Sequence, residues 1–471
     1  MGTSSRFFRY LRPVAAALLL LPLAGSTSQG PKPDPQVLAQ FGLFENATLQ
    51  RFIDGKGQQM NRVSDRPGDY GFTIVDSPVI NAFATPDGHV YFTRGIMAYF
   101  NNEAQFAGVL GHELGHITAR HGQKQQTRST IASVLLGVGS LLNRNVAALA
   151  QPLSQGLGVL FLKYSRDNEN EADGLGVKYS TKIGYDAAQM ADFFLTLQRT
   201  EAQSGAGGIP TFLSSHPNSA DRYTRVKGLA AQQKSTLGKT RLNVNRDAYL
   251  RAIEGLPYGD DPRQGFVEGG VFYHPGLKFR FPVPSGWKTQ NSPDKFQMAE
   301  PNGKALLVFL GAPGSSLQEA GQAVAKQLGL QSVNAQQTTI NGLPALTFEG
   351  DQVQQDQSGQ QAVGAHTVVT LLQDGKSIFA FIGLAAPASF ASYAPQFAAA
   401  AQGYQRLTEA AKLNRQPERV RIKTAKTAVS LSQALAASGI ASKRYEELAI
   451  LNGMKTTDRL AVGQLYKVVG K

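Results

Sequence analysis

The 471-residue chain contains no cysteine, which excludes disulfide scaffolds, cysteine-ligated zinc, iron–sulfur clusters and thiol catalysis. Only 17% of its residues are charged, too few for a disordered chain, and 42% are hydrophobic, as in globular proteins. Histidine is also scarce, with seven in the whole chain, so a metal site must be built from these few imidazoles and from carboxylates. The length exceeds what one hydrophobic core supports, and we expect about two to four domains.

The net charge of +13 is concentrated near the two ends of the sequence. Residues 1–26 hold three Arg and no acid, and residues 406–471 hold 13 Lys or Arg against five Asp or Glu. A basic tail suits an anionic membrane surface or a cell-wall glycan at least as well as DNA, and it is equally consistent with a solvated surface. Because the body between the two ends is nearly neutral, we expect no nucleic-acid partner.

Residues 1–26 have the pattern of a secretory signal peptide. Arg6, Arg9 and Arg12 precede a short apolar run at residues 14–23, and small residues follow at 24–26. The run is too short to cross a bilayer easily, although a transmembrane anchor is the alternative. The mature chain is therefore expected in the periplasm or outside the cell, with association with the outer membrane left open.

Changes in composition divide the rest of the chain into four parts. Residues 27–35 form a Pro-rich linker, and residues 36–255 combine helical periodicity with a few short strand-like runs. Residues 266–405 alternate strand-like runs with one or two helices, as in a separate α+β accessory domain. Residues 418–471 form a last, small module.

The sequence Gly-His-Glu-Leu-Gly-His at residues 111–116 lies inside a helix that we expect to run from about Asn102 to Gln126. His112 and His116 are four residues apart, so their imidazoles lie on one helix face and can reach the same ion. Glu113 is rotated by about 100° from His112, which places its carboxylate beside the metal as a base. This arrangement predicts a catalytic zinc site.

A catalytic zinc ion needs a third protein ligand, and a second expected helix offers one. Glu169 and Asp173 are four residues apart and share a face, whereas Glu171 points about 200° away from Glu169. Glu169 can therefore ligate while Asp173 accepts the second N–H of a ligating imidazole. A charged face that is only solvated is the alternative.

These motifs resemble the gluzincin metallopeptidases of the Oma, HtpX and CAAX-prenyl-protease family, and most closely its periplasmic branch of β-barrel assembly-enhancing proteases. The resemblance covers residues 36–235 and includes the runs at residues 81–84, 88–95 and 119–122. It implies an α+β fold with a mostly helical, zincin-like metalloprotease domain and a small β-ribbon. It also implies endopeptidase activity and one Zn²⁺ per chain, with Glu169 as the third ligand.

His216 lies in a Ser-Ser-His-Pro sequence, and Arg222 follows six residues later. The resemblance implies that this histidine lies over the metal, either as a removable fourth ligand or as a donor to the transition state. It also implies that Arg222 supports the site beside Asp173. A structural loop histidine is the alternative for His216. Structural roles are expected for the other histidines, His89, His121, His274 and His366.

The end of the chain, from Tyr445 to Val468, resembles the second half of a LysM glycan-binding module, which has a βααβ order. The first half departs from the pattern, because Thr427–Leu431 lacks the usual Gly-Asp. Binding of a cell-wall glycan and docking to an anionic membrane surface therefore remain equal alternatives for this module.

Two functions from different classes follow. The first is a secreted zinc metalloendopeptidase that degrades misfolded or unassembled envelope proteins, with the β-ribbon at His89–Thr93 offering an edge to an extended substrate. The second is a zinc-stabilised holdase or assembly factor without proteolytic activity. Glu113 favours the enzyme, because a purely structural zinc site needs no acid beside the metal.

Overall fold

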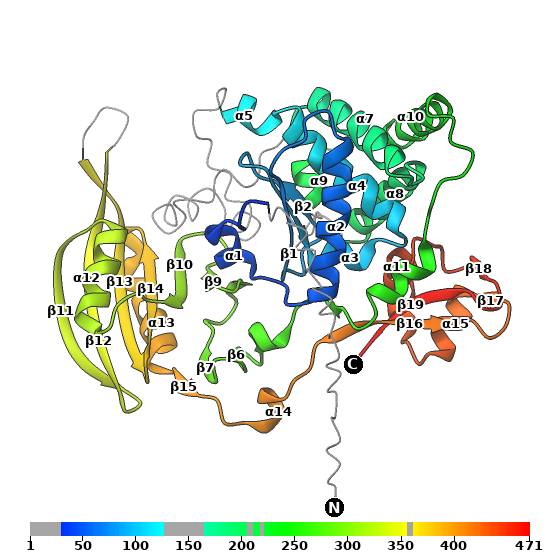
Figure 1. Cartoon of the computed structure of the whole chain (residues 1–471). Coiled ribbons are helices and arrows are strands. Elements are labelled where there is room, and N and C mark those ends of the chain that lie inside the picture. Colours follow the sequence, from blue (N-terminus) through cyan, green and yellow to red (C-terminus); the bar gives the residue numbers. More distant parts are fainter. Residues whose placement is uncertain (1–29, 127–163, 205–210, 217–220, 356–360) are drawn as a thin grey trace, which may run out of the picture.

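A computed structural model describes residues 30–126, 164–204, 211–216, 221–355 and 361–471. The expected signal peptide therefore lies outside the described residues. Helices and strands are mixed throughout the chain, which confirms the α+β class (Figure 1). The sheet-rich accessory part lies on one side of the molecule, and the helix-rich part with the tail module lies on the other (Figure 1).

The helix-rich part is built around a small three-stranded sheet. Strands β1 (Gly71–Val75) and β3 (His89–Thr93) pair in parallel, and β2 (Ala82–Ala84) pairs antiparallel to β3. The surrounding helices are α1 (Pro35–Phe41), α2 (Ala47–Val63), α3 (Arg94–Tyr99), α4 (Glu103–Thr118), α5 (His121–Gln126), α7 (Arg166–Lys182), α8 (Ala188–Ser204), α9 (Thr211–Ser215), α10 (Arg222–Thr236) and α11 (Arg246–Ala252).

The order of this sheet is β1-β3-β2, so β3 is its central strand. The expectation that His89–Thr93 offers a free edge to a substrate is therefore wrong. All five residues of β3 are buried, and its central position comes from pairing with both β1 and β2, which the pattern of one strand does not reveal. The outer strand on that side is β2, and the turn after it borders the site described below.

The helix expected up to Gln126 is interrupted. α4 ends at Thr118, Arg120 takes the left-handed conformation with φ of 59°, and α5 starts at His121. A non-glycine residue in this conformation costs about 1–2 kcal/mol, which the contacts around it must offset. Because of this break, His121 points in a different direction than it would in a continuous helix, and it contacts a residue of the site described below.

The accessory part is a seven-stranded sheet of order β11-β12-β13-β14-β10-β9-β8, with α12 and α13 packed on its opposite faces. A second sheet of order β15-β7-β6-β5 lies beside it. The elements are β5 (Phe266–Glu268), β6 (Val271–His274), β7 (Phe279–Pro282), β8 (Lys288–Asn291), β9 (Lys295–Ala299), β10 (Ala305–Gly311), α12 (Leu317–Leu328), β11 (Leu330–Ile340), β12 (Leu343–Gln355), β13 (Gln361–Asp374), β14 (Ser377–Ala385), α13 (Pro387–Gln402) and β15 (Gln405–Arg406).

The tail has the expected order of strand, helix, helix and strand. β16 (Glu418–Thr424) and β19 (Leu465–Gly470) pair antiparallel, with α15 (Leu431–Ala437) and α16 (Tyr445–Leu451) between them. The minor elements of this part are β4 (Pro257–Tyr258), α14 (Ala410–Leu413), β17 (Val429–Ser430) and β18 (Arg459–Leu460). The domain boundaries predicted from the sequence stay predictions.

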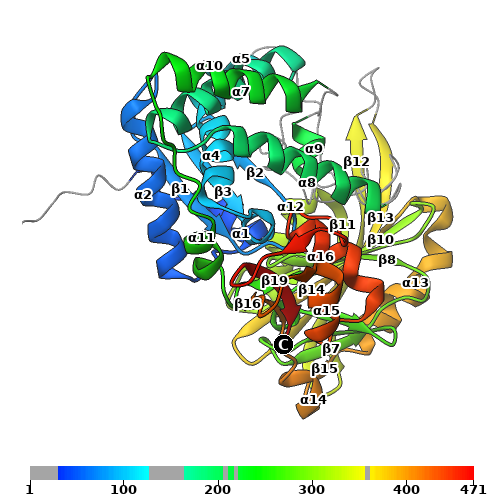
Figure 2. The same cartoon turned by 90° about the vertical axis from the view of Figure 1, so that its right-hand side faces the viewer.

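The tail packs directly onto the helix-rich part and shares one hydrophobic core with it. β16 pairs with β4, and α16 lies against α8 (Figure 2). Leu448 and Val468 belong to the same cluster of buried side chains as Phe100 and Phe193. The fully buried amine of Lys467 donates hydrogen bonds to the carbonyls of Ala98 and Phe100, at 2.7 and 3.1 Å. This packing is unlike that of a module on a flexible tether.

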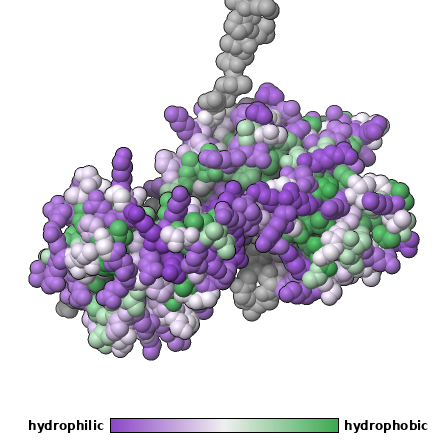
Figure 3. All heavy atoms as spheres, turned by 90° about the horizontal axis from the view of Figure 1, so that it is seen from below, coloured by the Kyte–Doolittle hydropathy of each residue, from purple (hydrophilic) through white to green (hydrophobic). Residues whose placement is uncertain are grey.

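Among the described residues, no helix combines the length and the apolar character needed to cross a bilayer. The face of the molecule seen in Figure 3 is largely hydrophilic, with hydrophobic residues in small separate areas.

We expect Lys467→Met to destabilise the protein by about 1–3 kcal/mol near pH 10, because two buried carbonyls lose their donor. Burial lowers the pKa of Lys467 well below its usual value of about 10.4. Below pH 10 the unfolded chain takes up a proton at Lys467 that the folded chain does not, so wild-type stability falls relative to the variant towards pH 7. Urea unfolding of both proteins between pH 7 and 10 measures the difference in their free energies of unfolding, which should become smaller towards pH 7.

Lys423→Met is the matched control, because Lys423 is exposed on the neighbouring strand β16. It should unfold like the wild type at each pH. A stability difference between wild type and Lys467→Met that does not change with pH would contradict the role of burial.

Candidate metal centre

Four buried side chains from three parts of the chain converge on one point. His112 and His116 come from α4, Glu169 comes from the first turn of α7, and His216 directly follows α9. Nε2 of His112 lies 3.1 Å from Nε2 of His116 and 3.2 Å from Nδ1 of His216. The Glu169 carboxylate lies 3.0 Å from His216, 3.5 Å from His116 and 3.6 Å from His112.

These separations fit a tetrahedral zinc ion. Zinc bonds of about 2.0–2.1 Å at tetrahedral angles place neighbouring ligand atoms about 3.3 Å apart. The chemistry of the donor set, three imidazoles and one carboxylate, is also that of zinc sites. The four residues therefore form a buried group that can hold one metal ion, with all four corners supplied by the protein.

The close approach of α4 and α7 puts the ligands within reach of one another. A Cβ atom built on Gly176 would lie only 2.9 Å from the backbone nitrogen of His112, and one on Gly111 would lie 2.9 Å from the carbonyl of Gly176. Only glycine allows the two backbones to come this close. The glycine before His112 is therefore part of what builds the site.

Asp173 lies beneath His112 and is held by two arginines. Its carboxylate is 3.0 Å from Nδ1 of His112, a close contact that is not aligned as a hydrogen bond. Arg222 donates to both of its oxygens at 2.8 and 2.9 Å, and Arg225 adds a contact of 2.6 Å. Burial alone would raise the pKa of Asp173, but Arg222 and His112 together outweigh burial and hold the pKa well below its usual range. The carboxylate is thus ionised.

The Glu169 carboxylate is also ionised. Its burial opposes the charge, but His216, His116 and His112 surround it and hold its pKa well below the usual value. Arg222 adds a contact of 3.2 Å to the same carboxylate. Burial lowers the pKa of His116, which keeps its imidazole neutral and its lone pair free for a metal.

Glu113 is fully buried beside this group, and neither of its carboxylate oxygens has a hydrogen-bond partner among the described residues. Its nearest charged neighbour is His216, with Nε2 3.5 Å from Oε1. Burial raises the pKa of Glu113. A buried carboxyl without a hydrogen-bond partner raises the free energy of the folded protein unless another group binds it. Glu113 can therefore bind a further partner, such as a water molecule or a substrate.

His121 was expected to be structural, but the structure places it against His116. Nδ1 of His121 lies 3.0 Å from Nδ1 of His116, and its Nε2 lies 3.1 Å from Glu171. Sequence reasoning missed this contact because it assumed one continuous helix. The residues at the break, Ala119 and Arg120, carry no turn signal of the kind that glycine or proline gives.

The remaining histidines lie away from the centre. His89 bonds to Thr73 and stacks on Tyr91. His366, in the accessory part, contacts two acids, Asp351 at 2.6 Å and Glu349 at 3.4 Å. It therefore has partners that the sequence did not reveal.

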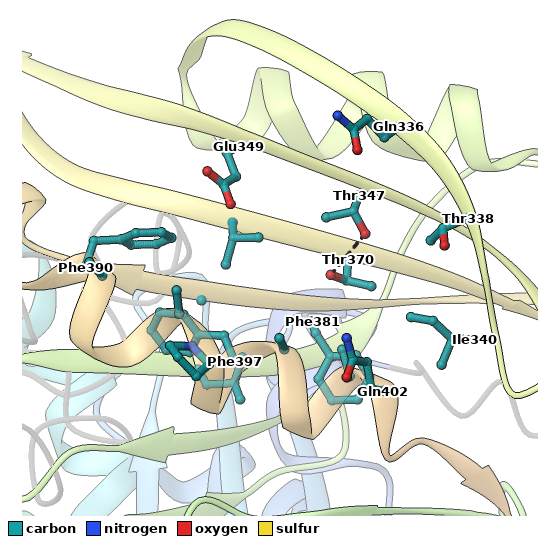
Figure 4. Close-up of a pocket in the computed structure, with 18 of the residues that line it drawn as sticks. Gln336, Thr338, Ile340, Thr347, Glu349, Thr370, Phe381, Phe390, Phe397 and Gln402 are labelled. Atoms are coloured by element: carbon teal, nitrogen blue, oxygen red, sulfur yellow. Dashed lines mark hydrogen bonds between the residues drawn. The ribbon is translucent and has the colours of Figure 1, made fainter.

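Two cavities differ in their relation to the metal centre. One of about 240 Å³ borders it and is lined by His116, Tyr164, the turn after β2, Arg66 and Arg120. A larger one of about 940 Å³ lies in the accessory part, between α13 and the sheet, where Phe390 faces Thr370 and Glu349 (Figure 4). None of the predicted site residues lines the larger cavity. Its size is therefore no sign of an active site.

The donor set is that of a metallopeptidase-like centre, and comparison with known proteins finds a matching family for part of the chain. The pattern of Peptidase family M48 matches residues 45–230, and these residues form a domain of that family. The putative beta-barrel assembly-enhancing protease of Vibrio cholerae is 29% identical over 200 residues, covering 40% of this chain and 41% of that protein. The beta-barrel assembly-enhancing protease of Escherichia coli K12 is 27% identical over 231 residues, covering 47% and 46%.

A more distant organism has a similar protein. The mitochondrial metalloendopeptidase OMA1 of Arabidopsis thaliana is 30% identical over 151 residues, covering 32% of this chain and 29% of that protein. The chain thus spans less than half the length of the relatives described here. The accessory part and the tail lie beyond the residues that match the family.

We expect Gly176→Ala to weaken zinc binding and lower stability by about 1–3 kcal/mol, because its Cβ forces α7 away from His112. Zinc affinity by competition with a chromogenic chelator and thermal unfolding of the apoprotein measure the two effects. Gly174→Ala is the matched control, because it lies on the same helix with open space around it. It should bind zinc normally and unfold no earlier than the wild type. Equal zinc affinity in both variants would contradict the packing argument.

Proposed function

We propose that the protein is a zinc-dependent metalloendopeptidase of the cell envelope that cleaves misfolded or unassembled envelope proteins. The observation that carries this proposal is the buried carboxyl of Glu113, which has no hydrogen-bond partner among the described residues and lies beside a group that can hold one metal ion. The family of the domain and the printed names of its relatives, which are proteases, support the same conclusion.

His112, His116 and Glu169 would hold the zinc ion, and Asp173 and Arg222 would fix the ligands from behind. Zinc bound there would polarise the scissile carbonyl and lower the pKa of a water molecule. Glu113 then takes the proton from the attacking water and passes it to the leaving amine. Its raised pKa suits a group that must both accept and return a proton.

His216 keeps the site closed in the described conformation. Its Nδ1 would take the fourth position around a metal ion held by His112, His116 and Glu169, a position that a catalytic zinc site leaves open for water or substrate. Phe212 stacks on its ring at 4.5 Å between centroids, which stabilises this placement. We infer a latent enzyme that opens when the segment carrying His216 moves; the displaced imidazole remains a candidate donor to the transition state.

The closed fourth corner also favours the alternative function. Four protein ligands are typical of structural zinc, as in a zinc-stabilised holdase or assembly factor without proteolytic activity. Glu113 argues against this alternative, because a structural site gains nothing from a buried, unpaired acid.

The sequence adds a proposed location. The signal peptide proposed at residues 1–26 would direct the chain to the periplasm or out of the cell. The basic tail module would contact a cell-wall glycan or an anionic membrane surface, including that of the outer membrane.

We expect Glu113→Gln to retain one zinc per chain, because it keeps the ligands. Its rate of casein cleavage should fall at least 100-fold, because it lacks the base. His216→Ala should cleave casein faster than the wild type, because it opens the fourth corner. Zinc content by atomic absorption and cleavage of unfolded casein test both variants. Full zinc loading with no cleavage by any variant would favour the holdase.

We also propose that the 240 Å³ cavity beside His116 accepts a side chain next to the cleaved bond. Its lining holds two cationic side chains, Arg66 and Arg120, against one acid, Asp87. The volume suits a single amino-acid side chain. The excess of positive charge predicts a preference for Asp or Glu in the substrate.

In the His216→Ala background, peptides with Glu next to the cleaved bond should give about 3–10-fold higher kcat/KM than those with Lys, as expected for a partly exposed charge pair. Arg120→Asn should remove most of this preference, and asparagine tolerates the left-handed conformation at this position. Arg62→Gln, an exposed arginine on α2 outside the cavity, is the matched control. An unchanged preference in Arg120→Asn would disprove this assignment.

A further inference from the structure

The contact between His121 and His116 depends on the break between α4 and α5. In a continuous helix, His121 would point about 140° away from His116. Instead Arg120 turns the chain, and His121 returns to His116 with both Nδ1 atoms 3.0 Å apart. His121 is fully buried, whereas Glu171 on its other side is 54% exposed.

We propose that His121 and Glu171 are positioning residues that fix the orientation and tautomer of His116. This inference rests on the proposed function, because it assigns His116 to a zinc ion. The carboxylate of Glu171 accepts a hydrogen bond from Nε2–H of His121, and Nδ1 of His121 accepts one from Nδ1–H of His116. Nε2 of His116 is then left unprotonated, with its lone pair directed into the site.

If His116 ligates a metal ion through Nε2, one arrangement of protons satisfies all three groups. Nε2 of His116 faces the site, 3.1 Å from Nε2 of His112, so its Nδ1 must face away. A neutral imidazole that ligates through Nε2 carries its proton on Nδ1. The acceptor at 3.0 Å is Nδ1 of His121, so His121 carries its own proton on Nε2, where Glu171 lies 3.1 Å away. Each donor in the chain thus meets one acceptor.

Ring stacking adds a second constraint on His116. Tyr164 stacks on its imidazole, with ring centroids 3.9 Å apart and planes inclined by 25°. Stacking fixes the plane of the ring but allows two orientations, related by a 180° rotation about the Cβ–Cγ bond. The hydrogen bond that Nδ1–H of His116 donates to His121 selects one of these two orientations and points Nε2 at the site.

The two ligand histidines are therefore held differently. His112 lies over Asp173, a buried carboxylate clamped by Arg222 and Arg225. His116 is held through a second imidazole that leads to a partly exposed acid. An orienting partner of a metal-bound histidine contributes about 10–100-fold to metal affinity, so the loss of this chain is measurable.

The test uses the full chain and measures zinc affinity by competition with a chromogenic chelator. His121→Phe, which removes the acceptor, should weaken zinc binding by about 10–100-fold. His121→Asn, whose side-chain oxygen still accepts from His116, should stay within about 3-fold of the wild type. Glu171→Gln should lie between the two, because its amide oxygen accepts more weakly than a carboxylate.

Asp167→Asn is the matched control for charge, because Asp167 is exposed on the same helix as Glu171. Its zinc affinity should equal that of the wild type. Nitrogen-15 NMR of the zinc-loaded protein gives an independent readout: the Nδ1–H signal of His116 should shift in Glu171→Gln and not in Asp167→Asn. Since Glu171 is partly exposed, this comparison stands even if His121→Phe does not fold.

If Glu171→Gln and any folded His121→Phe bind zinc as tightly as the wild type, this inference is wrong, and the proposed function is unaffected. Equal losses in His121→Asn and His121→Phe would also overturn it, because the accepting atom would then be irrelevant. A wild-type protein that binds no zinc would overturn the proposed function and this inference with it.

Discussion

The site depends on the contact between the backbones of α4 and α7. Gly111 and Gly176 let the two helices approach so closely that a single methyl group would force them apart. This approach brings the carboxylates of α7 under the imidazoles of α4, where ion pairs with Arg222 keep Asp173 charged. The candidate metal centre is thus a consequence of helix packing, and its geometry depends on two residues that carry no functional group.

The sequence predicted the parts of the site that follow from local periodicity. The spacing of His112 and His116, and of Glu169 and Asp173, places each pair on one helix face, and the structure brings His112, His116 and Glu169 together with His216. The roles of these residues remain predictions. The contact of His121 with His116 was not predicted, because it depends on the left-handed conformation of Arg120. The side chain of Arg120 gives no sign of a turn. The central position of β3 was not predicted, because it depends on pairing with two other strands and not on the sequence of β3 itself.

The α+β class was predictable, but the relation between the parts was not. The tail was expected as a separate module, and its strand–helix–helix–strand order follows the expectation. Periodicity within the tail could not reveal that its apolar face completes the core beneath α3 and α8, because that contact joins residues far apart in the sequence. Lys467 reads as one more basic residue of a charged tail, although its amine is buried against two backbone carbonyls.

The bond from Lys467 to Ala98 spans 369 residues and has a consequence for the order of folding. The core around the candidate centre includes side chains from β16 and β19, so it cannot close before residues near 469 are available. While the chain is being made, its His-Glu-Leu-Gly-His segment is present before the tail side chains that complete the neighbouring core. In this topology the core beside the candidate centre is complete only after the tail has been made. Contacts of such long range are slow to form, so the delay is built into the topology.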